Sequence, residues 1–394
     1  MRKRLQELIT EIEPEIIELR RQIHSCPEAG FAEEKTAALI SEILTREGIE
    51  HEREVAQTGV VGIVGSGSGP VIGIRADMDA LPIEEKTGLS FSSEKENMMH
   101  ACGHDGHVAI LLGVAIAAAE IADELPGKIK LIFQPAEEGP GGAAPMIAEG
   151  VLENPSVDYM LALHIWSKEE AGYIGLKQGA FFASADEFDL DILTESAHGA
   201  SPHQGQDAIL IASKIVQSLQ GIVSRNIDPV KSAVITVGKI MGGYRRNVIA
   251  DNVRLEATVR ALDTEVRSLL HKRIEEVVAG ICASEDADYK LDYRKLYPPL
   301  INDEKVVDHI YQEALKIAGQ ERVKFIDDPT MGAEDFAHFL QQRPGAMFLL
   351  GGQNPDKGIT APHHHPEFDF DEDIMALGVE VFLTTALSLM NSRP

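Results

Sequence analysis

A single change in the order of predicted strands and helices most constrains how this chain folds. In the first part, short β-rich runs alternate with helical stretches, an order typical of an α/β layer with a mostly parallel sheet. From Phe181 the predicted order becomes strand, helix, strand, strand, helix, strand, which is the split βαβ pattern of a ferredoxin-like unit. The β-rich runs of the first part are 71–76, 128–134 and 159–164.

The chain then returns to the first pattern, with helices at 304–318 and 374–390 around a strand. Its 394 residues exceed the ~250–300 at which one hydrophobic core stops growing. We therefore predict one α/β domain, formed by 1–180 and 294–394, with a mixed, mostly parallel sheet between helices. An inserted α+β domain of residues 181–293 splits it. Because such a unit leaves edge strands unpaired, we expect it to form a homodimer.

The charge and the apolar runs limit the partners that we expect. The chain has 36 basic and 63 acidic residues, a net charge of −27, which works against binding to nucleic acid or anionic lipid. The longest apolar run, 108–119, is shorter than the ~20 residues that span a bilayer, so it predicts a buried helix. The Gly-rich segment 62–69 lacks the spacing of a phosphate-binding loop and is interpreted as a hairpin or loop.

The cysteines indicate the compartment. There are three, Cys26, Cys102 and Cys282, with no C-x-x-C spacing. This excludes a disulfide scaffold and favours a reducing environment. The basic start of the chain is followed by a charged helical stretch rather than a signal-peptide core. We therefore expect a cytoplasmic protein.

A cluster of histidines directly precedes the predicted buried helix. Residues 100–107 read HACGHDGH, with three histidines, one cysteine and one aspartate. Cys102 and His104 can converge on one point because Gly103 permits a tight backbone, and cysteine with histidine is a common metal-ligand set. An equally open interpretation is a polar helix start, with Asp105 as the cap and the histidines as exposed neighbours.

Three further segments could contribute to the same site. Glu137 and Glu138 follow the strand 128–134; they could form a solvated turn, or one could bind a cation while the other acts as a base. His164 closes the next strand, and the histidines of 363–365 lie between two prolines. Each signal alone is weak. Together they offer sulfur, nitrogen and oxygen ligands, which suit zinc, manganese, cobalt or nickel better than magnesium or calcium.

Six short motifs extend over nearly the whole chain. They are RADMDALP at 75–82, HACGHDGH at 100–107, PAEEG at 135–139, AHGASPH at 197–203, GG at 242–243 with NVI at 247–249, and HHPEF at 364–368. In this order they resemble the motifs of the M20 metallopeptidase clan. The resemblance is to its amidohydrolase branch, the N-acyl-L-amino acid, hippurate and indole-acetyl-amino-acid hydrolases.

The resemblance implies a function and a set of site residues. It implies a metal-dependent hydrolase that cleaves a small N-acyl amino acid into a carboxylic acid and a free amino acid, with Glu137 as the general base. His198 of the inserted domain would reach the active site of the partner subunit, and Asn247 would hold the substrate carboxylate. The implied ligands of two divalent transition-metal ions are Cys102, His104, Glu138, His164 and His364.

The substrate carboxylate requires local cations in so acidic a protein. Arg245 and Arg246, beside Asn247, are candidates, although a solvent-facing loop explains this pair equally well. Thr194, Ser167 and Ala250 differ from residues common in the family, and they bear on the choice of substrate rather than on the chemistry.

Other functions remain open at this point. A dipeptidase or carboxypeptidase of the same clan would use the same metal ions. Alternatively, Cys102 could be a thiol nucleophile paired with His104, in which case a chelator would not abolish activity. A metal-binding protein without catalysis would have no need for Glu137 beside a ligand carboxylate.

Overall fold

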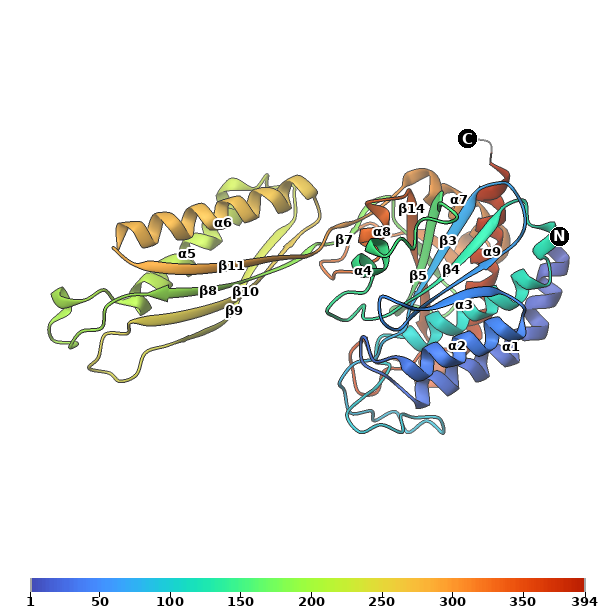
Figure 1. Ribbon diagram of the computed structural model, residues 1–394, viewed down its shortest axis with the longest axis horizontal. Coiled ribbons are helices and arrows are strands. Elements are labelled where there is room, and N and C mark those ends of the chain that lie inside the picture. Colours follow the sequence, from blue (N-terminus) through green and yellow to red (C-terminus); the bar gives the residue numbers. More distant parts are fainter. Residues whose placement is uncertain (1, 393–394) are drawn as a thin grey trace. The chain divides into compact units, whose positions relative to one another are not determined.

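The computed structural model describes residues 2–392 and divides into two compact units, which are described separately (Figure 1). The α/β unit comprises the chain up to Gly179, Ile301–Asp328 and the chain from His338 onward. The inserted unit comprises Ala180–Leu300 and Pro329–Ala337.

The inserted unit is larger than the predicted insertion of 181–293. Its last strand continues to Tyr297, beyond the apolar pattern from which the strand was predicted. The segment 329–337, expected in the α/β domain, also belongs to it. Hydrogen bonds hold this segment, since Thr330 N–H donates to the Phe181 carbonyl at 2.9 Å and Ala183 N–H donates to the Gly332 carbonyl at 2.8 Å. No periodic pattern in 329–337 could have revealed these bonds.

An eight-stranded sheet forms the centre of the α/β unit, in the order β1-β2-β4-β3-β5-β14-β6-β13. Strand β3 pairs in parallel with β4 and β5, and β5 pairs in parallel with β14, whereas β1, β2 and β4 pair antiparallel. This confirms the predicted mixed, mostly parallel sheet. The strands are β1 Glu50–Val55, β2 Gly59–Val64, β3 Val71–Asp77, β4 Lys128–Gln134, β5 Tyr159–Glu170, β6 Ile174–Leu176, β13 Val323–Phe325 and β14 Gly345–Gln353.

The interpretation of 62–69 as a hairpin or loop is confirmed, because β1 and β2 form an antiparallel hairpin and 65–69 form a loop. Residues 62–64 belong to β2, which is paired on both sides, with β1 and with β4. Its glycines hide the strand pattern. Gly62 has a reason to lack a side chain, because a Cβ there would lie 3.2 Å from Leu44 Cδ1.

Helices cover the sheet of the α/β unit. Apolar residues recur every three or four positions along α1, and Leu5, Ile9, Ile12, Ile16 and Leu19 are buried. Helix α3 is buried on all sides, as predicted for 108–119. The helices are α1 Arg2–Ser25, α2 Glu34–Arg46, α3 His104–Ala119, α4 Ala143–Ala148, α7 Glu304–Ala318, α8 Ala337–Leu340 and α9 Met375–Asn391, with 3₁₀ turns η1 Ala122–Glu124, η3 Gln320–Arg322, η4 Pro355–Lys357 and η5 Glu372–Ile374.

One stretch within residues 2–392, Glu372–Asn391, is long and apolar enough to cross a membrane by length and composition. Of its most apolar window, 67% is buried. Its apolar side chains, Val379, Phe382 and Leu383 among them, belong to the main hydrophobic core. The apolar character of this helix is therefore accounted for by its packing.

The inserted unit has its elements in the predicted order. Two helices pack on one face of a sheet ordered β11-β8-β10-β9. A hydrophobic core separate from that of the α/β unit lies between the helices and this sheet. Asp207 and Asp263 cap the two helices by accepting backbone N–H groups of their first turns. The elements are β8 Ala185–Leu193, η2 Pro202–Gln204, α5 Ala208–Asn226, β9 Ala233–Gly242, β10 Asn252–Ala261, α6 Thr264–Ser284 and β11 Asp288–Tyr297. The strands β7 Gly179–Phe182 and β12 Leu300–Asn302 span the chain boundaries of the unit and form a further two-stranded sheet.

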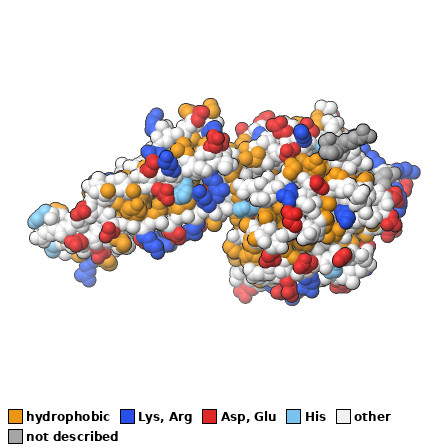
Figure 2. Space-filling view, turned by 45° about the horizontal axis from the view of Figure 1, so that its top comes forward, with side chains coloured by type: hydrophobic (Ala, Val, Ile, Leu, Met, Phe, Trp, Pro, Cys, Tyr) orange, Lys and Arg blue, Asp and Glu red, His pale blue; other side chains and the backbone are white. Residues whose placement is uncertain are grey.

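The acidic excess is not gathered in one place on the visible surface. In Figure 2, acidic and basic side chains are interspersed over the face in view. On the sheet of the inserted unit, for example, Arg254 pairs with Asp189 at 2.9 Å and with Asp191 at 3.1 Å. Much of the local negative charge is therefore matched by neighbouring cations.

Candidate metal centre

The residues predicted as metal ligands come from four segments of the α/β unit. Cys102 lies just before α3, which begins at His104, and Gly103 between them has a φ of 87°. That left-handed conformation suits glycine, and it produces the tight backbone expected from the sequence. Glu138 follows β4, and His164 lies within β5. His364 lies beyond β14, where its backbone N–H donates to the Ala101 carbonyl at 2.8 Å.

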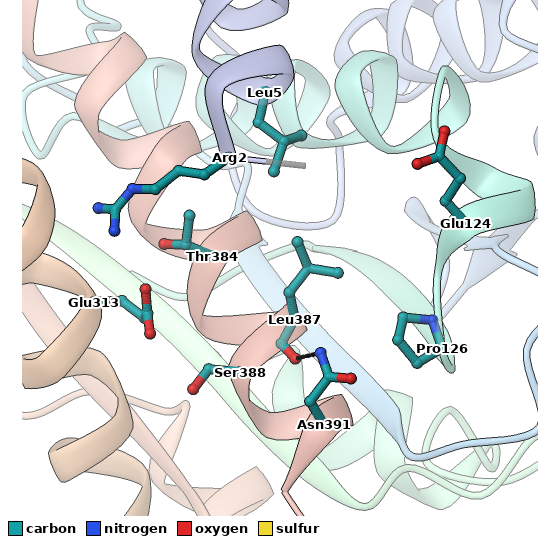
Figure 3. A pocket seen from close by; sticks show the side chains of 9 residues that line it. All are labelled: Arg2, Leu5, Glu124, Pro126, Glu313, Thr384, Leu387, Ser388 and Asn391. Atoms are coloured by element: carbon teal, nitrogen blue, oxygen red, sulfur yellow. Dashed lines mark hydrogen bonds between the residues drawn. The ribbon is translucent and has the colours of Figure 1, made fainter.

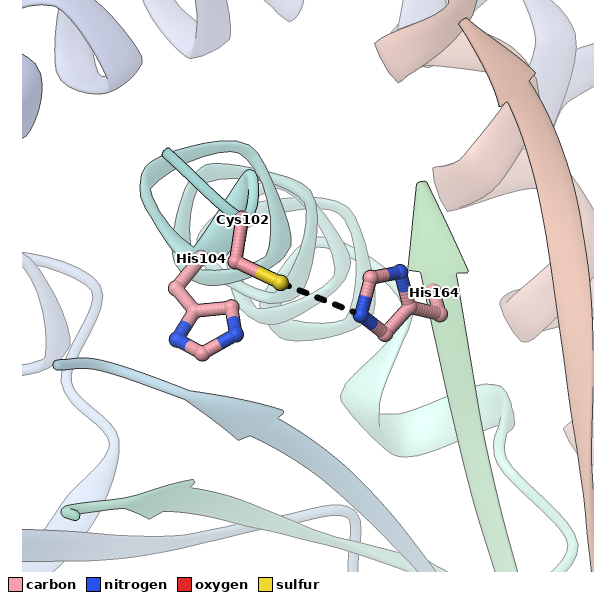
Figure 4. A group of neighbouring side chains, drawn as sticks. All are labelled: Cys102, His104 and His164. Carbon is pink, nitrogen blue, oxygen red and sulfur yellow. Dashed lines mark hydrogen bonds between the residues drawn. The ribbon is translucent and has the colours of Figure 1, made fainter. Parts of the chain in front are cut away.

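The structure brings all five predicted ligands and Glu137 together. The ligand atoms of Cys102, His104 and His164 lie within 4.8 Å of one another (Figure 4). Those of Cys102, Glu138 and His364 form a second such group, and those of His104, Glu137 and Glu138 a third. Cys102 therefore belongs to two overlapping groups, an arrangement that suits two neighbouring ions.

The side chains fit a transition-metal ion. Cys102 Sγ lies 3.6 Å from His164 Nε2, and His364 Nε2 lies 3.2 Å from Glu138 Oε1. Two ligands roughly 2.0–2.3 Å from one tetrahedral ion stand about that far apart. His104 Nε2 is also buried without a hydrogen-bond partner among residues 2–392. Buried polar atoms normally have partners, so this atom fits a bound cation.

The electrostatics of the site also favour a cation. Burial and the nearby carboxylates of Glu138 and Glu137 raise the pKa of the Cys102 thiol. A nucleophilic cysteine needs the opposite shift, which disfavours the thiol-nucleophile alternative. Burial, together with His107, holds the pKa of His164 well below its ordinary value, so its imidazole is neutral and able to bind a metal.

Backbone carbonyls fix the orientation of two of the predicted ligand histidines. His104 Nδ1–H donates to the Asp79 carbonyl at 2.9 Å, and His164 Nδ1–H donates to the Ile165 carbonyl at 2.6 Å. In both rings the Nε2 atom is then left for a metal ion. Hydrogen bonds of this kind set the tautomer of ligating histidines.

Asp79 supports the site by a second route. Its two carboxylate oxygens accept the backbone N–H groups of Glu137 at 2.9 Å and of Glu138 at 3.0 Å. Asp79 thus holds the turn that carries both glutamates. Sequence reasoning did not assign this role. The available signal was its place two residues after Asp77, at the carboxyl end of β3.

The alternative interpretation of the cluster at 100–107 was wrong. His100, His104 and His107 are all buried, and α3 has no side-chain cap. His107 supports the site, because its Nδ1–H donates to Asp77 at 2.6 Å and its Nε2 accepts the Ile165 N–H at 2.9 Å. Asp105 pairs with Arg20 at 2.7 Å instead of capping the helix.

The remaining predicted site residues lie in exposed loops of the inserted unit. His198 and Val248 form an isolated antiparallel bridge, and Gly199 N–H donates to the Asn247 carbonyl at 2.9 Å. His198 and Asn247 are therefore neighbours. Arg245 and Arg246 precede Asn247 and are exposed.

A separate pocket of about 480 Å³ lies in the α/β unit, beside the start of α1, the second half of α9 and Glu313 of α7 (Figure 3). Its described lining includes no histidine or cysteine, so it does not have the chemistry of the metal centre. It is lined by Arg2, Leu5, Glu124, Pro126, Glu313, Thr384, Leu387, Ser388 and Asn391.

Two crystal structures resemble the chain over nearly its full length. One, of a protein from methicillin-resistant Staphylococcus aureus, has a TM-score of 0.94 and 36% identity and covers 99% of this chain and 100% of its own. The other, YxeP of Bacillus subtilis, is described as a dinuclear metal binding peptidase from the M20 family. It has a TM-score of 0.84 and 31% identity and covers 98% of this chain and 99% of its own.

Curated relatives also align over almost the whole length. The N-acetyl-L-cysteine deacetylase of Bacillus subtilis is 39% identical over 98% of this chain and 90% of its own. Thermostable carboxypeptidase 1 of Saccharolobus solfataricus is 39% identical over 99% of both chains. The model of peptidase family M20/M25/M40 matches residues 73–388, which contain all the predicted ligands. The chain therefore belongs to peptidase family M20/M25/M40.

Proposed function

We propose that this protein is a metal-dependent amidohydrolase of N-acyl-L-amino acids, such as N-acetyl, benzoyl or indole-acetyl conjugates. The products are a carboxylic acid and a free amino acid. One observation carries the proposal: Glu137 and Glu138 follow the same strand, and both lie within 4.8 Å of His104, while only Glu138 also groups with Cys102 and His364. This difference supports Glu138 as a ligand and its neighbour Glu137 as the base.

Cys102, His104, Glu138, His164 and His364 would hold two divalent ions, of zinc, manganese, cobalt or nickel. Such ions supply Lewis-acid chemistry, which polarises an acyl oxygen and acidifies a water molecule. The Glu137 carboxylate takes a proton from the attacking water and delivers it to the leaving amine. Asp79 keeps that carboxylate in place through the backbone N–H of Glu137.

The inserted unit would complete the site in a homodimer. Its edge strand β9 exposes Ile240 and Met241, at 57% and 40%, and an exposed apolar edge is suited to pairing with a second copy. His198 of one subunit would donate a hydrogen bond to the oxyanion in the other, a contribution of about 3 kcal/mol. Asn247, with Arg245 and Arg246, would hold the substrate carboxylate. The three free cysteines support a cytoplasmic location.

Glu137→Gln tests the role of the base. We expect turnover of an N-acyl amino acid to fall ~100–10,000-fold while bound metal stays at the wild-type level, because the ligand Glu138 is untouched. Glu52→Gln, on the exposed strand β1, is the matched control and keeps full activity. Persistent activity of the Glu137 variant refutes the assignment.

Mixed dimers test the action of His198 across the subunit interface. A dimer of one His198→Ala subunit and one Glu137→Gln subunit contains one intact site if His198 acts in the partner. We expect such heterodimers to recover part of the wild-type activity. Verified heterodimers without any recovery contradict the proposal.

A dipeptidase or carboxypeptidase activity is the second candidate. It is favoured by the relatives named thermostable carboxypeptidase, which align as completely as the deacetylase does. A panel of N-acetyl-, benzoyl- and indole-acetyl-amino acids and dipeptides separates the two activities. After chelation, each candidate metal is added back in turn, which identifies the ion that supports turnover.

A further inference from the structure

Glu33 is a buried carboxylate whose described partners include no cation. It directly precedes α2 and is 0% exposed. Its Oε1 accepts the backbone N–H of Ala136 at 2.9 Å, and its Oε2 accepts the hydroxyl of Thr58. Burial raises the pKa of Glu33, because the ionised form is poorly solvated there.

The partner of Glu33 is the residue directly before Glu137. Ala136 is fully buried, and its φ of 56° is in the left-handed region that residues with a side chain rarely adopt. A strained backbone of this kind persists only where its surroundings determine it. Here carboxylates accept three consecutive backbone N–H groups: Glu33 accepts that of Ala136, and Asp79 accepts those of Glu137 and Glu138.

The chain segment that carries Glu33 also packs closely on this turn. A Cβ placed on Gly30 would lie 2.8 Å from the Ala136 Cβ, so the two backbones approach as closely as glycine permits. The same segment is tied to the end of β3, because Ala80 N–H donates to the Glu28 carbonyl at 2.7 Å. Glu33 is therefore a short, rigid link between the start of α2 and the turn after β4.

We propose that Glu33 is a positioning residue for Glu137, acting through the backbone of Ala136. It keeps Ala136 in its left-handed conformation, and that conformation sets the direction of the Glu137 carboxylate. The inference rests on the proposed role of Glu137 as the base. It assigns no contact between Glu33 and substrate or metal.

Three substitutions of Glu33 separate the effect of its side-chain length from the effect of its charge. Glu33→Gln loses the charge but still offers an oxygen to Ala136 N–H and an amide to Thr58. Glu33→Asp keeps the charge but retracts the carboxylate by about 1.5 Å, so the bond to Ala136 is lost. Glu33→Leu keeps the volume and removes both acceptors. We expect near-wild-type kcat for the Gln variant and a fall of roughly 100-fold for the other two, with KM changed less than ~3-fold, because misplacement by about 1 Å costs that much.

Thr58→Val is the matched control. It removes the hydroxyl from the other carboxylate oxygen and leaves the bond to Ala136 in place. We expect it to lower the melting temperature and to keep kcat within ~3-fold of wild type. Bound metal stays at the wild-type level in all four variants, because no ligand is changed. If the Leu variant fails to fold, the comparison of kcat between the Asp and Gln variants still tests whether Glu33 positions Glu137.

Amide hydrogen exchange tests the link independently of activity. Peptides containing residues 136–138 should exchange at least ~10-fold faster in the Asp variant than in the wild type, and at the wild-type rate in the Gln variant. If Glu137→Gln proves active, the proposed function fails. The exchange measurement still tests whether Glu33 holds the backbone of Ala136. Higher kcat for Asp than for Gln, or unchanged exchange in the Asp variant, overturns the proposal.

Discussion

His24 carries a pH-dependent part of the stability of the α/β unit. Its ring is buried between two carboxylates, with Nδ1 at 2.8 Å from Asp105 and Nε2 at 3.2 Å from Glu85. Carboxylates only accept hydrogen bonds, so both ring nitrogens must donate and the ring is an imidazolium. Burial alone would lower the pKa of His24, but Asp105 and Glu85 raise it to about 9.

The expected magnitude follows from that pKa. The difference between about 9 in the folded protein and the ordinary 6.5 of histidine corresponds, at about 1.4 kcal/mol for each pH unit, to about 3–3.5 kcal/mol. Because the pKa is raised on folding, this stabilisation is fully present below pH 6.5. It is lost as the pH rises through 9.

Urea unfolding of the metal-loaded protein at about pH 6 and about pH 9.5 measures the effect. Over this interval the wild type should lose about 3 kcal/mol more free energy of unfolding than His24→Gln, which has no titrating ring. Glu85→Gln removes only the more distant carboxylate, so there the extra loss should shrink rather than vanish. Equal pH dependence of the wild type and the His24 variant would refute the reasoning.

Three further perturbations test the packing and the metal centre. Lys130→Met should lower the free energy of unfolding by about 2–3 kcal/mol in urea titrations, because the buried Nζ donates to three backbone carbonyls at 2.7–3.0 Å. Gly106→Ala should cost about 1–3 kcal/mol and reduce bound metal, measured by thermal melting and metal analysis, because the new Cβ would lie 2.5 Å from Phe370 Cζ and 2.6 Å from Ile165 Cδ1. Chelation should lower the melting temperature in calorimetry, since free metal at about 100 times its Kd adds about 2.7 kcal/mol to the folded state, and an unchanged melting temperature contradicts a native metal site.

Elements with an unambiguous apolar pattern could be predicted from the sequence. The strand 128–134 has the predicted bounds, and α3 is buried up to Ala118, because a helix that is apolar on all sides is stable in water only inside a core. The ligand candidates could also be identified, since most of them follow strands or precede the buried helix, although His164 lies within β5 rather than at its end. Parallel strands bring such residues to one edge of a sheet.

The rest depends on contacts between distant parts of the chain. The start of 62–69 is a strand only because β1 and β4 lie on either side of it. Likewise, nothing in the local sequence shows that Glu33 meets Ala136 or that Arg20 meets Asp105, over separations of 103 and 85 residues. Such partners are selected by tertiary packing and leave no periodic signal.

The place of β14 in the sheet has a consequence for biosynthesis. This strand, Gly345–Gln353, lies between β5 and β6, which precede it by more than 160 residues in the chain. On the ribosome, the middle of the sheet therefore stays open until the chain is nearly finished, while most of the inserted unit has already emerged. Pairing over such a separation is slow, and the open edge of β5 is exposed to wrong partners during that time. We therefore expect nascent chains that stop before β14 to depend on chaperones more than the finished protein does.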